Sequence, residues 1–331
     1  MRLLVLGGTN FVGRSVVGEA LRRGDEVTTV NRGVSGEPPA GAHRIQADRR
    51  DSRALEAALG ADKWDAVIDT WSMEPAVVRE SARLLAGRAG HYGYVSSRSV
   101  YCWPLPVGLD ESAPVVDGDP ESADHADYAA AKRGGELAVL EHFDGRALLA
   151  RAGLILGPYE DVGRLPWWLG RISRGGRVLA PGPADRGLQY VDARDLARWM
   201  LDAAERGSSG AFNAVSRPGH TTIGELLETC NDVVGRAAEL VWRSPEVIEA
   251  GGVSGWTQLP IWVPPSGEMA GLHDGDVSAA HAEGLSCRPV RDTVADTWRW
   301  LQEEGFPEPR ADRPPLGLDP DVERELLDAR H

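Results

Sequence analysis

Short apolar runs alternate with amphipathic segments through the first half of the chain. The runs have the length and composition of buried strands, and the segments between them show helical spacing. The predicted strands are Leu3–Leu6, Val27–Val30, His43–Ala47, Ala66–Asp69, Tyr92–Ser96 and Ala147–Arg151. The predicted helices are Gly13–Arg23, a segment near Ala54–Leu59, one from Pro75 and one around Tyr128–His142. This alternation predicts an α/β fold with a Rossmann-type, doubly wound and mostly parallel sheet.

The pattern changes after Gly157-Pro158, where Gly, Pro and Trp become frequent. We predict that residues 1–153 and about 187–215 form the sheet domain. Residues of about 154–186 and 216–305 are predicted to form a smaller, interleaved C-terminal substrate lobe over the carboxyl edge of the sheet. Residues 306–331 are predicted to be a Pro-rich tail ending in a short acidic helix, with Asp319 as N-cap and Pro320 at its first position.

Composition narrows the possible partners. The chain has 331 residues, of which 42% are hydrophobic and 26% charged, as in ordinary globular proteins. Its formal net charge of −14 disfavours nucleic acid and membrane surfaces as partners and leaves a small-molecule substrate. Three scattered cysteines and no signal peptide indicate a cytoplasmic protein without a metal site.

The segment Gly7-Gly-Thr-Asn-Phe-Val-Gly13 lies between the first strand and the first helix, where a dinucleotide-binding loop belongs. Asn10 stands where such loops carry their middle glycine. Asn is the non-glycine residue that best tolerates left-handed backbone, so the substitution is compatible with the site. A strand–helix turn without a ligand is the alternative. The predicted cofactor contacts of this loop are Gly7, Thr9, Asn10, Phe11, Val12 and Gly13.

The end of the second strand indicates which cofactor binds. An acidic residue there holds the ribose 2′-hydroxyl of NAD, and an arginine can accept the 2′-phosphate of NADP. This chain has Asn31-Arg32-Gly33 and no acid. The sequence therefore favours NADP(H), with NAD(H) as the alternative.

A second group of residues predicts redox chemistry. Tyr128 and Lys132 form a YxxxK pair on a predicted helix, which places both side chains on one face. The chain has only two lysines, and the chance expectation of such a pair is roughly 0.04. An ammonium group one turn from a phenol lowers the phenol's pKa towards the working range of an acid–base catalyst. Upstream, the segment Ser96-Ser-Arg-Ser99 follows a strand and offers hydroxyls to a substrate oxygen.

Together these motifs resemble the extended short-chain dehydrogenase/reductases, often called NAD-dependent epimerase/dehydratases, from residue 1 to about 215. The resemblance implies a Rossmann domain with an interleaved substrate lobe, and a homodimer built on the two helices that flank the active site. It makes Ser97, rather than Ser96 or Ser99, the catalytic serine, with Tyr128 as the base and Lys132 as its helper. It also adds cofactor contacts at Asp48 and Arg49, which would flank the adenine, and at Thr70, Trp71 and Gly153.

The chain departs from the family pattern at informative places. Sugar-nucleotide dehydratases of the family carry a carboxylate beside the catalytic serine, where this chain has Arg98 and Ser99, so dehydration is disfavoured. Arg98 either reaches the substrate or lies at the surface. Leu154 stands where related epimerases place an asparagine that helps to hold a diphosphate. The Trp-rich second lobe favours a flatter or more apolar substrate, with core packing as the alternative role of its tryptophans.

The sequence thus predicts an NAD(P)-dependent oxidoreductase that transfers hydride at a carbonyl or hydroxyl carbon of a small molecule. One alternative is an NAD-dependent epimerase of a sugar or sugar nucleotide, which would use the same residues. An alternative of another class is a non-catalytic NAD(P)-sensing or RNA-binding relative. The complete Ser-Tyr-Lys set and the negative charge both disfavour that third possibility.

Overall fold

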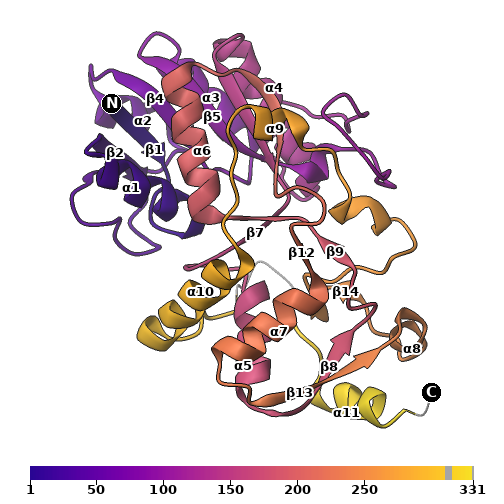
Figure 1. The fold of residues 1–331 in the computed structure, drawn as a ribbon. Helices are drawn as coiled ribbons and strands as arrows, with labels where there is room; N and C mark the ends of the chain where they lie inside the picture. Colours follow the sequence, from indigo (N-terminus) through magenta and orange to yellow (C-terminus); the bar gives the residue numbers. More distant parts are fainter. Residues whose placement is uncertain (310–314, 330–331) are drawn as a thin grey trace.

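The computed structural model describes residues 1–309 and 315–329. Its largest element is a seven-stranded parallel sheet in the order β11-β6-β5-β4-β1-β2-β3 (Figure 1). The strands are β1 (Arg2–Leu6), β2 (Glu26–Asn31), β3 (His43–Gln46), β4 (Trp64–Asp69), β5 (Ala89–Ser97), β6 (Ala147–Ala152) and β11 (Gly210–Ala214). The predicted Rossmann-type doubly wound sheet is therefore confirmed.

Helices cover both faces of this sheet. One face carries α1 (Phe11–Arg23) and α6 (Ala193–Arg206), which pack against each other. The other face carries α2 (Ser52–Leu59), α3 (Pro75–Leu85) and α4 (Tyr128–Phe143). Because both faces are covered, the central strands are apolar almost throughout, as in Leu3, Leu4 and Val5 of β1, which have no exposed surface.

The strand order reverses between β1 and β4, and this reversal positions the ligand site. From β1 the chain winds outwards through β2 and β3, then returns to β4 on the other side of β1. The loops that follow β1 and β4 therefore leave in opposite directions and open a crevice at the carboxyl edge of the sheet. Gly7 and Thr70, which follow β1 and β4, lie at this crevice.

The second lobe lies beyond this edge and has its own core (Figure 1). Its main helices are α5 (Arg164–Ser173), α7 (Ile223–Val233), α8 (Pro245–Ala250), α10 (Val290–Glu304) and α11 (Pro320–Asp328). Its longest strands, β8 (Gly176–Pro181) and β13 (Ala238–Arg243), pair in parallel. Trp168 and Trp262 are fully buried here, which confirms core packing for these two tryptophans.

The sequence pattern did not predict α5. Its Pro166 and paired tryptophans are typical of a loop, but Pro166 lies in the first helical turn, where no backbone N–H partner is needed. The short helix α11, in contrast, begins as predicted. Asp319 accepts hydrogen bonds from the backbone N–H groups of Asp321 and Val322, and Pro320 occupies the first position.

The remaining elements of the chain's described part are short. They are β7 (Leu154–Leu156), β9 (Gly187–Leu188), β10 (Tyr190–Asp192), β12 (Thr221–Thr222), β14 (Gly255–Trp256), β15 (Leu259–Pro260), the 3-10 helices η1 (Arg98–Val100) and η2 (Ala270–His273), and α9 (Ser278–Ala282). From η2 the chain returns to the sheet domain, where Ala280 and Leu285 join the core beneath α6. Residues 278–285, which the sequence pattern places in the substrate lobe, therefore pack on the sheet domain.

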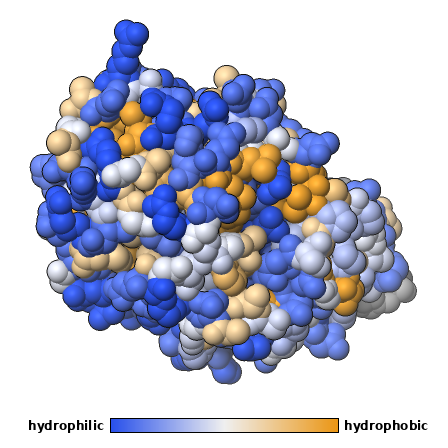
Figure 2. Space-filling view, turned by 90° about the horizontal axis from the view of Figure 1, so that it is seen from above, coloured by the Kyte–Doolittle hydropathy of each residue, from blue (hydrophilic) through white to orange (hydrophobic). Residues whose placement is uncertain are grey.

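The surface agrees with an acidic, charge-rich chain. Figure 2 shows a mostly hydrophilic face on which apolar residues gather in small patches. Within residues 1–309 and 315–329, no helix has the length and apolar character that crossing a membrane would require.

Candidate active site

The glycine loop between β1 and α1 corrects one expectation about Asn10. The residues with positive φ in this loop are Gly7 (124°), Gly8 (100°) and Phe11 (34°), whereas Asn10 is extended with a φ of −119°. Position 10 therefore does not require a residue that tolerates left-handed backbone. In the amide orientation that satisfies both of its polar atoms, Nδ2 donates to the carbonyls of Thr9 and Ser35 at 3.2 Å. Asn10 ties the loop to the segment that follows β2.

Gly13 allows α1 to start close to the loop. A Cβ atom at this position would lie 2.7 Å from the backbone nitrogen of Gly8. No side chain fits there without moving the loop. The Asn10 side chain accepts no hydrogen bond from the start of α1, so the first backbone N–H groups of that helix remain available to an anion at its positive end.

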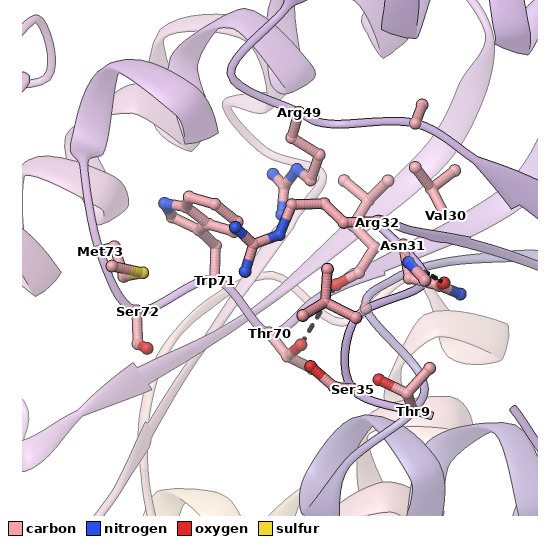
Figure 3. A pocket seen from close by; sticks show the side chains of 15 residues that line it. Thr9, Val30, Asn31, Arg32, Ser35, Arg49, Thr70, Trp71, Ser72 and Met73 are labelled. Atoms are coloured by element: carbon pink, nitrogen blue, oxygen red, sulfur yellow. Dashed lines mark hydrogen bonds between the residues drawn. The ribbon is translucent and has the colours of Figure 1, made fainter. Parts of the chain in front are cut away.

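A pocket of about 160 Å³ lies between the ends of β1, β2 and β4 (Figure 3). We call it the β1–β4 pocket. The predicted cofactor contacts that line this pocket are Gly7, Thr9, Asn31, Arg32, Arg49, Thr70 and Trp71. Asn31 Oδ1 accepts a hydrogen bond from the backbone N–H of Gly33, and its buried Nδ2 has no partner among the described residues. Figure 3 shows the Arg32 side chain beside Arg49 and Trp71.

Arg49 lines the β1–β4 pocket and is held in place by contacts within the chain. Its guanidinium is buried and makes two hydrogen bonds of 2.7 Å to the carboxylate of Asp69. It also donates to Ser81 Oγ, and its charge lies 5.0 Å from the centre of the Trp71 ring. Arg49 therefore supports the pocket floor through internal contacts. Asp48 is exposed, accepts the backbone N–H of Arg50, and is not among the residues that line either pocket.

A larger space of about 960 Å³ runs from the glycine loop to the second lobe, and we call it the interlobe cleft. It brings together most of the remaining predicted residues. Those lining it are Asn10, Phe11, Val12, Gly13, Thr70, Ser97, Tyr128 and Gly153. The second lobe contributes Trp167 and Trp256, among others. The glycine loop and the predicted catalytic side chains thus face one continuous cleft.

Ser97 is the last residue of β5 and is almost fully buried. Its Oγ caps the short helix η1 by accepting the backbone N–H of Ser99 at 3.1 Å, and it donates to Ser99 Oγ at 3.1 Å. Ser96 points the other way, because successive side chains of a strand alternate, and its hydroxyl donates to Glu136 at 2.7 Å. Of these serines, Ser97 and Ser99 line the cleft.

Tyr128 and Lys132 lie one turn apart at the start of α4. Asp127 begins this helix by accepting the N–H groups of Ala129 and Ala130. Tyr128, its first residue, is 41% exposed and lines the cleft. Lys132 is buried beneath it, where Nζ donates to the backbone carbonyls of Trp71 and Val95, each at 2.7 Å. Lys132 therefore joins the ends of β4 and β5 under the tyrosine.

The surroundings of Lys132 act on its charge in opposite directions. Burial is the largest effect and lowers the pKa of Lys132 to about 7, whereas the carboxylates of Asp69 and Glu136 favour the ammonium form. Tyr94 lies next to it, with its ring centre 4.7 Å from Nζ. Burial raises the pKa of Tyr94 well above its ordinary value, so this phenol stays neutral.

A buried ion pair behind the site was missed by the sequence reasoning. Glu136 lies one turn after Lys132 and accepts hydrogen bonds from Ser96 and from Arg151 of β6, at 2.7 to 3.0 Å. Arg151 also donates to the hydroxyl of Tyr101, near the cleft's serines. This network fixes α4 against β5 and β6. A charged residue inside an Ala- and Gly-rich helix stretch was the signal that could have indicated it.

Arg98 is buried, so the structure excludes a surface role for it. Its Nη1 donates to the carbonyl of Leu272 at 2.9 Å and to Gln189 Oε1 at 3.3 Å. Its Nε and Nη2 meet no acceptor within the described parts of the chain. Burial lowers the pKa of Arg98 from its ordinary value. Arg98 belongs to the cleft wall directly after Ser97, and it links β5 to the η2 segment.

Glu160 is a further buried carboxylate that the sequence did not single out. It lies at the start of α5 and accepts the backbone N–H groups of Arg164 at 2.7 Å and Leu165 at 3.2 Å. Burial raises the pKa of Glu160 to about 7, although these hydrogen bonds favour its charged form. The N-terminus of α5 is therefore capped by the chain's own acid.

This pKa predicts a pH-dependent contribution to stability. Between pH 4.5 and about 7 the folded chain keeps the Glu160 proton that the unfolded chain loses, so this contribution falls as pH rises. Relative to Glu160→Gln, the wild-type free energy of unfolding should drop by roughly 3 kcal/mol from pH 4.5 to pH 8. Urea unfolding of both proteins at the two pH values measures it. If the two proteins differ in free energy of unfolding by the same amount at both pH values, the raised pKa of Glu160 is contradicted.

No group of histidine, cysteine, aspartate and glutamate side chains in the described ranges could hold a metal ion.

Comparisons with known proteins agree with this architecture. A sequence model of the NAD dependent epimerase/dehydratase family matches residues 3–215. The enzyme WbmH of Bordetella bronchiseptica, solved in complex with NAD+, is 17% identical with a TM-score of 0.70, covering 92% of this chain and 99% of its own. WbmG of the same organism, solved with NAD and UDP, is 19% identical with a TM-score of 0.68, covering 95% and 99%.

A UDP-glucose 4-epimerase of Thermotoga maritima, solved with UDP-glucose, is 18% identical with a TM-score of 0.65, covering 92% of this chain and 99% of its own. A search of curated proteins found no significant match. At these identities the solved structures support the fold, and the family match supports the resemblance first found in the motifs. The chain belongs to the NAD dependent epimerase/dehydratase family.

Proposed function

We propose that this protein is an NAD(P)-dependent oxidoreductase that transfers hydride at a carbonyl or hydroxyl carbon of a small molecule. The observation that carries the proposal is the single cleft in which the glycine loop, Ser97 and Tyr128 meet, with Lys132 beneath the tyrosine. The family match and the fold are consistent with it.

The residues present fit a dinucleotide. The helix α1 offers backbone N–H groups to a pyrophosphate, and Gly13 keeps the loop close enough to contact it. Asn31 lines the β1–β4 pocket, where an adenosine ribose would lie. Thr70, Trp71 and Gly153 line the path towards Ser97. When bound, the nicotinamide supplies or accepts the hydride.

The chain's own residues perform the proton transfer. In reduction, Tyr128 donates a proton to the substrate oxygen, and in oxidation it accepts that proton. The Lys132 ammonium stabilises the resulting phenolate from one turn away, because opposite charges at this separation favour the ionised form. Ser97 Oγ donates a hydrogen bond to the same oxygen and holds the reacting carbon in place.

Arg32 supports NADP(H) as the preferred cofactor. It is the exposed cation in the β1–β4 pocket, whereas Arg49 is held by Asp69, and Asn31 replaces the acid that would select NAD. Arg32→Ala should weaken NADPH binding by about 10- to 100-fold and leave NADH binding unchanged. Calorimetric titration with each nucleotide measures this.

The matched control for this variant is Arg53→Ala, an exposed arginine on α2 that lies outside the pocket lining. It should leave both affinities unchanged. Equal weakening of NADH and NADPH by Arg32→Ala would show that no 2′-phosphate contact is made. NAD(H) would then be the cofactor.

An epimerase of a sugar or sugar nucleotide is the second candidate. The observation in its favour is that WbmG was solved with UDP and the Thermotoga maritima epimerase with UDP-glucose. An epimerase regenerates its cofactor internally and retains it tightly. Extracting the nucleotide from freshly purified protein separates the two functions. Bound NAD(H) favours the epimerase, and an empty protein that binds and releases NADPH favours the reductase.

The family resemblance also leads us to propose a homodimer and a cytoplasmic location. A dimer built on α3 and α4 would bury the helix that carries Tyr128 and Lys132 and so stiffen one wall of the cleft. Light scattering on the purified protein measures the mass of the assembly.

A further inference from the structure

Several large aromatic side chains line the interlobe cleft, among them Trp103, Trp167, Trp256 and Phe306. Trp103 is 40% exposed and Phe306 52% exposed. Other large aromatic residues of the same lobe, such as Trp168, are fully buried. Exposed aromatic side chains gathered in one cleft are typical of a binding surface rather than of a core.

Trp256 is held in a conformation that sequence preference alone would not favour. Its φ is 67°, which is rare for a bulky residue, and its backbone N–H donates to the carbonyl of Trp262 at 2.8 Å. The guanidinium of Arg164 lies 4.5 Å from the centre of one of its rings. Strained backbone of this kind persists where the surrounding structure enforces it, and it is concentrated at functional sites.

Among the described residues, the lining of the cleft carries charges of both signs. Among the described residues that line it, the arginines Arg98 and Arg164 are balanced by the carboxylates Asp161 and Glu308. The Arg164 guanidinium covers the Trp256 ring. A nucleotide diphosphate would add negative charge that this described lining does not neutralise.

Two features that could bind a diphosphate, the start of α5 and Arg186, already have partners within the chain. The N-terminus of α5, where Gly163 and Arg164 line the cleft, has its N–H groups bonded to Glu160. Arg186 pairs with Asp274 at 3.1 Å and also donates to the carbonyl of Ala270. Replacing these partners with phosphate oxygens would leave two carboxylates without their donors.

Resting on the proposed hydride transfer, we infer that the substrate is an uncharged aromatic ketone or the corresponding aromatic alcohol. The aromatic ring of the substrate stacks on Trp167 and Trp256, and the substrate oxygen lies between Ser97 and Tyr128. In reduction the carbonyl carbon gains the hydride of NADPH and its oxygen gains the Tyr128 proton. The products are the alcohol and NADP+, and Tyr128 regains a proton from solvent.

Calorimetric titration of the full chain, with and without saturating NADPH, tests this class. The probes are 1-tetralone, cyclohexyl methyl ketone and UDP-glucose. The aromatic ketone should bind about tenfold more tightly than the saturated one, since stacking on an aromatic side chain contributes about one decade of affinity. UDP-glucose should show no binding. Trp256→Ala and Trp167→Ala should each weaken 1-tetralone binding about tenfold.

Trp298→Ala is the matched control, since this half-buried tryptophan of α10 lies outside the cleft lining. It should leave 1-tetralone binding unchanged, and circular dichroism checks that each variant is folded. Tighter binding of UDP-glucose than of 1-tetralone overturns the aromatic class, as do unchanged affinities in both cleft variants. Failure to bind NADPH or NADH overturns the proposed function instead, and 1-tetralone binding without cofactor still decides the substrate class.

Discussion

Replacing Tyr128 with phenylalanine is expected to lower kcat for ketone reduction by about 10²–10⁴-fold while NADPH binding stays unchanged. The variant keeps the ring that lines the cleft and removes only the hydroxyl that donates the proton. Asp127 and Lys132 keep their own contacts, because neither the helix cap nor the two carbonyl partners of Nζ involve the tyrosine hydroxyl. Stopped-flow measurement of NADPH oxidation with 1-tetralone gives the rate.

The control is Tyr159→Phe, which removes a hydroxyl from a tyrosine outside the cleft lining. Tyr159 stacks with Trp300 and lies under the Arg14 guanidinium through its ring, so the ring contacts survive the change. The kcat of the Tyr159→Phe variant should equal that of the wild type. Full activity of Tyr128→Phe would contradict proton transfer by Tyr128 and favour a cofactor-sensing function.

Replacing Asp69 with alanine is expected to lower the free energy of unfolding by about 3–5 kcal/mol. Asp69 has no exposed surface and accepts hydrogen bonds from Arg49, from the hydroxyl of Tyr92 at 2.7 Å and from the backbone N–H of Trp71 at 2.9 Å. Its removal leaves the Arg49 charge buried without a carboxylate. Urea unfolding at pH 7 measures the loss.

Three further variants make this result interpretable. Glu80→Ala breaks the exposed pair with Arg83 and should cost less than about 1 kcal/mol. Tyr92→Phe removes one hydrogen bond to Asp69 and should cost about 1–3 kcal/mol, which remains measurable if Asp69→Ala does not fold. The double variant Arg49→Met/Asp69→Leu should recover most of the stability, because it removes both charges. A loss no larger than that of Glu80→Ala would contradict the buried-pair argument.

The local features of this protein could be predicted from its sequence. The apolar strand, glycine loop and helix of residues 2–23 are adjacent in the chain, so their geometry follows from local preferences. The same holds for Tyr128 and Lys132, which one helical turn places on the same face, and for the Asp319–Pro320 helix start. The alternation of strands and helices then predicted a parallel sheet, because strand–helix–strand connections allow few other topologies.

Contacts between distant segments could not be predicted in this way. Arg49, which follows β3, pairs with Asp69 at the end of β4, although β2 and β1 separate these strands in the sheet. Arg98 reaches Leu272 across 174 positions of the chain. Glu136 likewise accepts a hydrogen bond from Ser96, which packing of α4 against β5 brings close.

The tryptophans show the same division between sequence and structure. Composition indicates an aromatic second lobe, but Trp168 is buried in its core while its neighbour Trp167 lines the cleft. One residue along a helix turns a side chain by about 100°. Which direction faces the core is set by the elements that pack around the helix. The sequence by itself therefore determined the glycine loop, the Tyr128–Lys132 pair and the sheet, whereas tertiary packing decided what surrounds them.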